Sequence, residues 1–149
     1  MLRTTLPVVT LVVIVTALAL GAGYYLASAG AIPPSVTWSV NPLFINFSSQ
    51  IGSGSSPDSF TCSPPVAPVT LKSTSNQPSI ITLTVTPSSF SSCGSTPDNI
   101  LVTATCTPVS QANNTCSGDF SGMVVVCGPT PYTCLKRTLI VVITVTDGE

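Results

Sequence analysis

Six cysteines are the side chains with the clearest potential for chemistry in this chain of 149 residues. Cysteine thiols pair as disulfides, bind metals as thiolates or act as nucleophiles. The chain contains no histidine and no Cys-x-x-Cys spacing, which disfavours a zinc site. An even number of cysteines in a short chain is typical of a disulfide-braced exported domain. The disulfide candidates are Cys62, Cys93, Cys106, Cys116, Cys127 and Cys134.

Six cysteines allow many pairings, and the sequence by itself does not choose among them. Chain-entropy arguments give about 2.5 kcal/mol for the shortest sequential loop and about 3.7 kcal/mol for the longest. We expect the sequential arrangement, in which Cys62 pairs with Cys93, Cys106 with Cys116, and Cys127 with Cys134.

Catalytic constellations are not evident elsewhere in the chain. Without histidine, neither a Ser-His-Asp nor a Cys-His arrangement can form. Carboxylate catalysis needs two acids at one site, and Asp58, Asp98 and Asp119 each stand in a Ser, Pro or Gly context typical of turns. Asp147 and Glu149 are close together, but we interpret them as solvated rather than as a calcium site. We therefore expect no enzymatic activity, no cofactor, no metal site and no small-molecule substrate.

Two Asn-x-Ser/Thr sequons begin at Asn46 and Asn113. Both are candidate glycosylation sites on an exported domain. Asn113 is favoured because it lies in an apparent loop between two cysteines. Glycans at these positions would help to keep a nearly uncharged surface soluble.

The composition restricts the possible partners. Charged residues make up only 6% of the chain, and the formal net charge is -1. Because nucleic-acid binding depends on basic residues that neutralise phosphates, this composition excludes a nucleic-acid partner. The polar surface must instead consist of Ser, Thr, Asn and Gln. The length suits one domain plus an appendage.

The appendage is an apolar segment from Leu6 to Ala27 that contains no charged residue. As a helix with a rise of about 1.5 Å per residue it would be on the order of 33 Å long, which spans a bilayer core. Gly30 and the prolines that follow it would end such a helix. Arg3 is the only charge before Asp58, which favours a cytoplasmic amino end and an exported, extracellular remainder.

A cleaved signal peptide is the alternative interpretation of this segment. Ala27-Ser28-Ala29 is a small-x-small cleavage triplet behind a basic start. Signal-peptide cores are typically about 7 to 15 residues long, so the length of the apolar run favours retention. We expect the segment to be kept as a membrane anchor or packing helix, and cleavage after Ala29 stays open.

Small residues recur every four positions within the apolar segment. Such a face lets helices approach closely in lipid or in a helical bundle, although Ala and Gly are also common in such segments for no specific reason. The pattern favours self-association through this helix. The candidate packing residues are Ala17, Ala19, Gly21, Gly23 and Ala27.

The layout of the chain resembles that of archaeal type IV pilins. A short leader is followed by about twenty apolar residues that run into Ala22-Gly23-Tyr24-Tyr25-Leu26, and then by a Ser/Thr-rich β domain. The resemblance implies that the hydrophobic helix forms a filament core and the β domain forms its outer wall. Membrane-anchored envelope proteins of archaeal viruses share the same general layout.

Beyond a linker at residues 31–34, the segment 35–149 is expected to form one domain, separate from the apolar segment 1–30. Short alternating runs separated by Pro, Gly, Ser and Asn predict an Ig-like antiparallel β-sandwich of about seven strands, with no helix required. A Gly/Ser-rich stretch at residues 48–59 is expected to be a flexible loop. The expected strands cover residues 36–40, 43–47, 69–73, 80–86, 100–107, 120–127 and 139–146.

Residues 119–127, the loop to Cys134 and the closing run resemble the second half of prokaryotic Ig-like repeat domains. The resemblance implies a sandwich, a fold that hosts adhesion, assembly and binding alike. The run at residues 139–146 is apolar on both sides over its first half, so we expect both of its faces to be covered by other parts of the protein or by another subunit. A central position in one sandwich or a neighbouring subunit would each supply that cover.

The sequence thus predicts a non-enzymatic extracellular structural subunit that is pilin-like, located on a cell surface or membrane and associated with itself. One alternative is a secreted or membrane-anchored Ig-like module for binding or adhesion. Another is a viral envelope glycoprotein, which the residues do not distinguish from the first hypothesis.

Overall fold

Short alternating segments of the chain form the strands of two β-sheets. A computed structural model describes residues 34–129, 134, 135 and 137–148, and the unit that begins at Pro34 is compact. Five strands precede residue 87 and four follow it. In chain order the elements are β1 (Ser35–Trp38), β2 (Leu43–Ser48), β3 (Ser53–Ser63), β4 (Val69–Ser75), β5 (Ile81–Thr86), β6 (Ser89–Phe90), β7 (Asp98–Cys106), α2 (Pro108–Ala112), β8 (Gly118–Cys127) and β9 (Leu139–Thr146).

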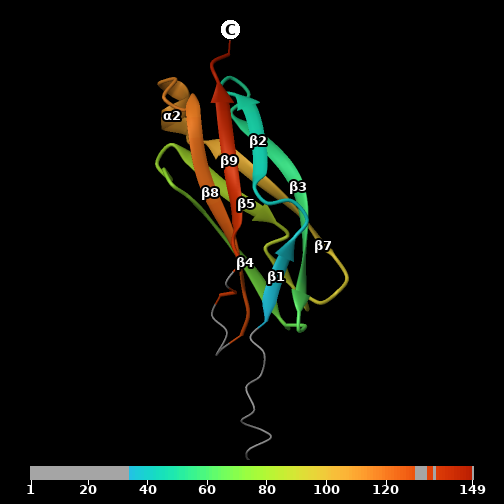
Figure 1. Cartoon of the computed structure of the whole chain (residues 1–149). Helices are drawn as coiled ribbons and strands as arrows, with labels where there is room; N and C mark the ends of the chain where they lie inside the picture. Colours follow the sequence, from blue (N-terminus) through green and yellow to red (C-terminus); the bar gives the residue numbers. More distant parts are fainter. Residues whose placement is uncertain (1–33, 130–133, 136, 149) are drawn as a thin grey trace, which may run out of the picture. The chain divides into compact units, whose positions relative to one another are not determined.

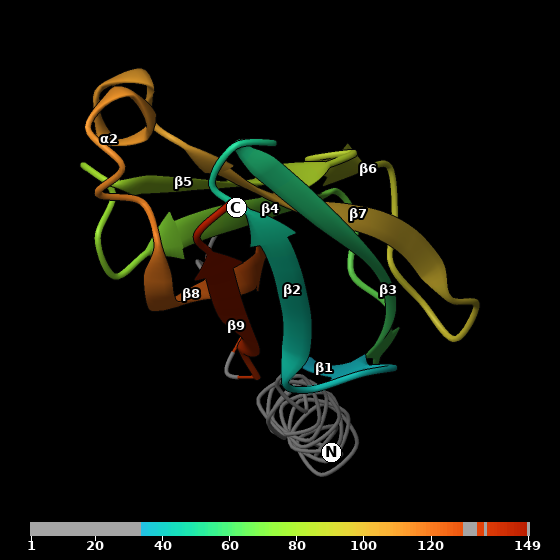
Figure 2. The ribbon, with the colours of Figure 1, turned by 90° about the horizontal axis from the view of Figure 1, so that it is seen from above.

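The two sheets contain four and five strands. Their strand orders are β1-β3-β7-β5 and β2-β9-β8-β4-β6 (Figure 1). Seen from above, β8, β9 and β2 lie on one side of the domain and β5 and β7 on the other (Figure 2). The expected β-sandwich is therefore present, with the fold mainly β.

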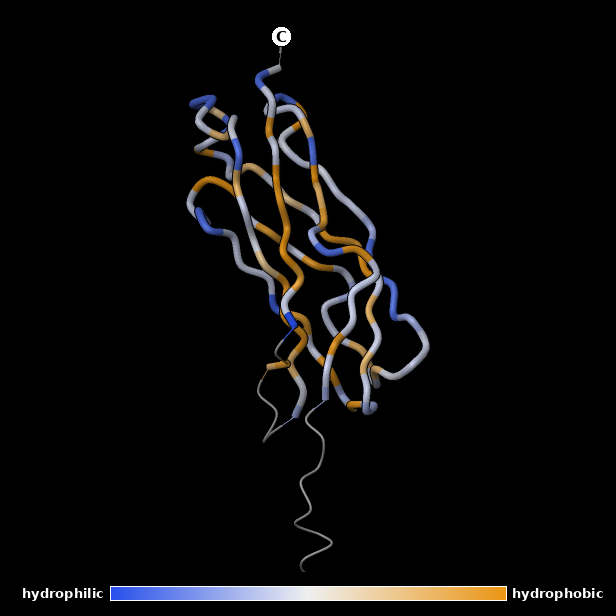
Figure 3. Tube along the Cα trace, in the orientation of Figure 1, coloured by the Kyte–Doolittle hydropathy of each residue, from blue (hydrophilic) through white to orange (hydrophobic). Residues whose placement is uncertain are grey.

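One hydrophobic core fills the space between the sheets. Along β9, Leu139, Val141, Ile143 and Val145 are buried and alternate with residues that face outward. The other long strands follow the same two-residue period, and hydrophobic positions concentrate in the strands (Figure 3). Because buried and outward-facing residues alternate, each long strand packs one face against the core and presents the other face on the outside of the sandwich.

Three aromatic rings pack together in this core. The ring centroids of Trp38 and Phe60 are 5.3 Å apart, and those of Phe60 and Phe90 are 5.5 Å apart with nearly perpendicular planes. The Trp38 indole donates a hydrogen bond to the carbonyl of Arg137 at 3.0 Å. The indole thus buries its ring while its polar N–H is satisfied.

All seven expected strands are present, but the flexible loop expected at residues 48–59 is wrong. Ser53–Ser63 forms β3, which pairs with β7 over eight residues and with β1 over four. A Cβ atom at Gly54 would lie 2.7 Å from Cδ1 of Phe47, so the glycine is needed for close packing across the sheets. The Gly/Ser composition of this segment therefore reflects packing and not flexibility.

The expectation of a purely antiparallel sandwich is wrong at one strand pair. β2 runs parallel to β9, from the pair Leu43 and Val141 to the pair Ser48 and Thr146. The chain crosses from one sheet to the other after β1 and does not reverse, so β2 keeps the direction of β1. Because β9 also points this way, β2 and β9 are parallel neighbours (Figure 1).

A short helix, α2, was not expected after residue 34. Thr107 caps it, because its side-chain oxygen accepts a hydrogen bond from the backbone N–H of Ser110 at 3.3 Å. Pro108 stands at the first helical turn, where its missing N–H costs nothing. The helix lies between two paired cysteines, Cys106 and Cys116.

The cysteines pair sequentially, as predicted. The described residues contain no free cysteine. Disulfides form and persist in oxidising compartments, so three of them indicate an oxidising, extracytosolic environment for the domain. The bridges are Cys62–Cys93, Cys106–Cys116 and Cys127–Cys134.

The bridges should contribute unequally to stability. Cys62 and Cys93 are 31 residues apart, whereas Cys127 and Cys134 are 7 apart. Replacing the first pair with alanine should lower the free energy of unfolding by about 3.7 kcal/mol, and replacing the second pair by about 2.5 kcal/mol, because a longer loop restricts the unfolded chain more. Denaturant unfolding of the two double variants measures the difference, and a larger loss for Cys127→Ala/Cys134→Ala would contradict this assignment.

Candidate docking surface

The two outer faces of the sandwich have different chemistry. The outer face of the four-stranded sheet is covered with hydroxyl groups, several of which bond to one another or to the backbone, as Ser55 does to Thr103 at 2.8 Å. Leu101 is the large apolar residue on this face. The hydroxyl residues are Ser35, Thr37, Ser55, Ser59, Thr61, Ser63, Thr82, Thr84, Thr86, Thr103 and Thr105.

The outer face of the five-stranded sheet carries a group of apolar side chains instead. Phe44 on β2 is 58% exposed, Met123 on β8 is 48% exposed and Ile140 on β9 is 45% exposed. Val125 and Val142 are half-buried beside them. We call these five residues the apolar stripe.

Strand register brings the stripe together from three strands. Phe44 pairs with Val142, and Ile140 pairs with Met123, so apolar side chains stand side by side on neighbouring strands. Val125 lies two residues beyond Met123 on the same face of β8. The five side chains thus form a diagonal band across the sheet. A contiguous exposed apolar patch of this kind is typical of a site that binds another molecule.

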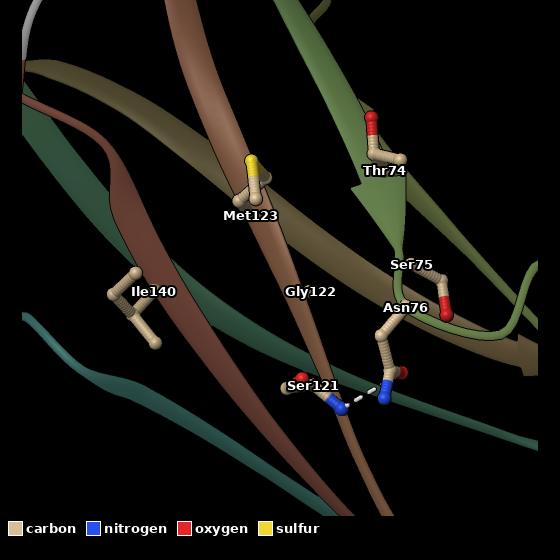
Figure 4. A pocket seen from close by; sticks show the side chains of 7 residues that line it. All are labelled: Thr74, Ser75, Asn76, Ser121, Gly122, Met123 and Ile140. Atoms are coloured by element: carbon tan, nitrogen blue, oxygen red, sulfur yellow. Dashed lines mark hydrogen bonds between the residues drawn. The ribbon is translucent and has the colours of Figure 1, made fainter.

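A small pocket adjoins the stripe at the end of β4, where Ser75 pairs with Gly122 of β8. It has a volume of about 180 Å³. Met123 and Ile140 stand on one side of it, and the backbone N–H of Ser121 donates to Oδ1 of Asn76 at 3.1 Å on the other (Figure 4). Its lining is completed by Thr74, Ser75 and Gly122.

Two opposite charges flank the stripe. Lys72 on β4 pairs in register with Val125, and Asp119 on β8 pairs with Thr144, whose hydroxyl donates to Oδ1 of the aspartate at 2.9 Å. Within the described strands, these are the charged residues that lie on an outer sheet face. The outer face of the five-stranded sheet thus carries both the apolar stripe and the charged residues of the described strands.

The closing strand β9 lies between β2 and β8, as a central strand. Its inner residues are buried, but Ile140 on its outer face stays exposed. The central position expected for this run is thus present, although among the described residues its outer face stays open at Ile140. The open alternative is cover by another molecule.

The aspartates do not stand in turns, as their sequence context had suggested. Asp58 lies in β3, Asp98 begins β7 and Asp119 lies in β8. Strand pairing with the neighbouring chain segments overrides the local turn preference of their Ser, Pro and Gly neighbours. Among the described residues, no group of three or more potential ligands is placed to hold a metal ion.

Asp58 is buried on the inner side of β3. Its Oδ1 accepts hydrogen bonds from the backbone N–H of Val40 at 3.1 Å and of Ser59 at 2.7 Å, so it holds the crossing between the sheets. Oδ2 is buried, and no described group donates to it. Burial raises the pKa of this carboxyl, and the two backbone donors offset that effect only in part.

The stability of the domain should therefore depend on the protonation of Asp58. Above the ordinary carboxyl pKa of 3.8, the unfolded chain loses this proton before the native state does. The native state then binds more protons, so the free energy of unfolding should fall as the pH rises from 3.8 through the raised native pKa. Asp58→Asn should remove this fall, and pH-dependent denaturant unfolding of both proteins measures it. A steeper fall in Asp58→Asn than in the wild type would contradict the sign.

Both predicted glycosylation sites are on the surface. Asn46 is exposed on the outer face of β2, two residues from Phe44, and Asn113 is exposed at the end of α2. Their exposure is compatible with modification, which stays a prediction.

The helix-packing residues Ala17, Ala19, Gly21, Gly23 and Ala27 lie outside the described residues. In the described part of the chain, no helix has the length and hydropathy required to cross a bilayer.

The stripe was not predicted as a site. Its signal was present in the run of residues 139–146, which is apolar on both sides, and in Phe44, which stands between two core residues. Only the register of the strands shows that these residues meet Met123 and Val125.

Comparison with known proteins finds no family model and no curated protein that matches the chain. Two solved structures have a similar arrangement. A two-domain protein of unknown function from Bacteroides fragilis has a TM-score of 0.45 and 10% identity, over 77% of this chain and 46% of that one. The fibronectin(III)-like modules of Clostridium thermocellum CbhA have a TM-score of 0.34 and 12% identity, over 78% of this chain and 48% of that one. The chain thus spans less than half the length of these structures.

Proposed function

We propose that this protein is a non-enzymatic structural subunit of an extracellular assembly, pilin-like in its layout. The apolar segment from Leu6 to Ala27 anchors the chain in a membrane or packs into a filament core. The disulfide-braced β domain faces outward and makes contacts for assembly or adhesion.

The observation that carries this proposal is the exposed apolar stripe on an otherwise hydroxyl-rich and nearly uncharged domain. Soluble monomeric domains rarely leave contiguous apolar surface open unless it is a contact site. Three disulfides support a location outside the cytosol. The apolar segment supports attachment to a membrane or to other copies.

Assembly through the helix should depend on its small-residue face. Gly23→Leu places a bulky side chain where helices are expected to approach closely, so it should abolish filaments while the β domain stays folded. Ala22→Leu is the matched control, because it adds similar bulk to the neighbouring position off that face and should leave filaments intact. Electron microscopy of both variants gives the answer, and normal filaments in Gly23→Leu would refute the packing role.

The intact mass of the native protein separates this proposal from its main alternative. A mass that includes residues 6–27 agrees with an anchor or packing helix. A chain that begins at Gly30 would instead support a secreted module for binding or adhesion, released by cleavage after Ala29. Recovery of the protein from virus particles, and not from cells, would favour the envelope-glycoprotein alternative.

A further inference from the structure

We propose that two copies of the β domain pack face to face through the apolar stripe, related by a two-fold axis that places Lys72 of each copy opposite Asp119 of the other. A second copy of this chain is thus the occupant of the open sheet face, whether or not residues 1–33 assemble into a filament.

The charges are the evidence for a second copy. Lys72 lies in register with Val125, and Asp119 lies six residues before Val125 on β8. The two charges are therefore at opposite ends of the stripe, about 20 Å apart along the strands. A surface with a cation at one end and an anion at the other complements itself when a copy is turned end for end.

The register fixes where the axis must lie. Gly122 is midway along β8 between the level of Asp119 and the level of Lys72. An axis that crosses the strands at this level exchanges the two ends of the sheet face. Each lysine then lies opposite an aspartate, with a sideways offset of about 4.8 Å for the one strand that separates them. A lysine side chain is long enough to cover that offset.

The same axis brings two apolar residues of β9 together. Ile140 pairs with Met123 on one side of the axis level, and Val142 pairs with Ser121 on the other. In the dimer, Ile140 of one copy therefore lies over Val142 of the other. Met123 lies over Ser121, at the edge of the pocket (Figure 4). A flexible thioether suits a small irregular hollow of this kind.

The area indicates a weak dimer. Four strands at about 4.8 Å spacing and about seven residues at 3.3 Å give a face of roughly 400 Å² per copy, or about 800 Å² in total, which is below the size of stable interfaces and in the range of weak, transient ones. Such contacts become populated at high local concentration, as on a membrane or in an assembly. The hydroxyl-covered face of the other sheet has no comparable apolar surface.

The apolar part of the contact is tested with two matched variants of the full chain. Ile140 and Leu101 are 45% and 44% exposed, but they lie on opposite outer faces. Ile140→Thr should weaken self-association about tenfold, because a central apolar contact is lost, whereas Leu101→Thr should leave it unchanged. Sedimentation over a range of concentrations measures association, and thermal unfolding checks that both variants are folded. Equal association in the two variants would overturn the proposal.

The charge pairing is tested by exchange. Lys72→Glu makes both charges of the face acidic, and Asp119→Lys makes both basic, so each variant alone should associate about tenfold more weakly than the wild type. An equimolar mixture of the two variants should associate again, because every cross-copy pair is then attractive. The double exchange Lys72→Glu/Asp119→Lys should also restore association, and 1 M salt should reduce all these differences.

Each outcome decides the proposal. Recovery of association in the mixture and in the double exchange supports a two-fold contact between copies. A mixture that associates no better than its components overturns the pairing. A wild-type protein that stays monomeric throughout the concentration range overturns the dimer and leaves the face to residues 1–33 or to a different partner. If Gly23→Leu abolishes filaments while the charge variants behave as expected, the helix contact and the sheet contact are separate.

Discussion

The register between β2 and β9 is the interaction on which the rest of the surface depends. The Asn41 side chain sets it, because its Oδ1 accepts from the backbone N–H of Ile140 and its Nδ2 donates to the carbonyl of Thr138, both at 3.0 Å. Leu43 then meets Val141 at the start of the parallel pair. A slip of one residue would turn the buried face of β2 outward and move Phe44 into the core.

The consequence of this register is a domain whose two outer faces serve different purposes. Hydroxyl groups cover the four-stranded sheet and keep it hydrated with no charge. The five-stranded sheet carries apolar side chains flanked by Lys72 and Asp119, which suits contact with another molecule. Buried Asp58 at the sheet crossing adds a pH-sensitive element that favours the folded state at low pH, because the neutral carboxyl is better accommodated there than the ionised one. Together these features agree with the proposed role as an outward-facing structural module.

Alternation in the sequence was sufficient to predict seven strands, because each has one apolar face. It was insufficient for β3, whose inner face holds Gly54 and Asp58, since the need for a glycine there arises from Phe47 on the other sheet. The presence of disulfides followed from the even number of cysteines, whereas their pairing did not follow from the sequence. The apolar stripe could not be predicted, because Phe44 and Met123 are far apart in the chain and meet only through β9.

Hydroxyl-radical footprinting of the full chain tests the central claim, that the stripe is a contact between copies, most directly. Labelling is compared at low and at high protein concentration. We expect Phe44, Met123 and Ile140 to become protected as copies associate, while Leu101 on the opposite face stays equally reactive. Unchanged labelling of the stripe at every concentration, or protection of Leu101 in its place, would show that the stripe is not a contact between copies.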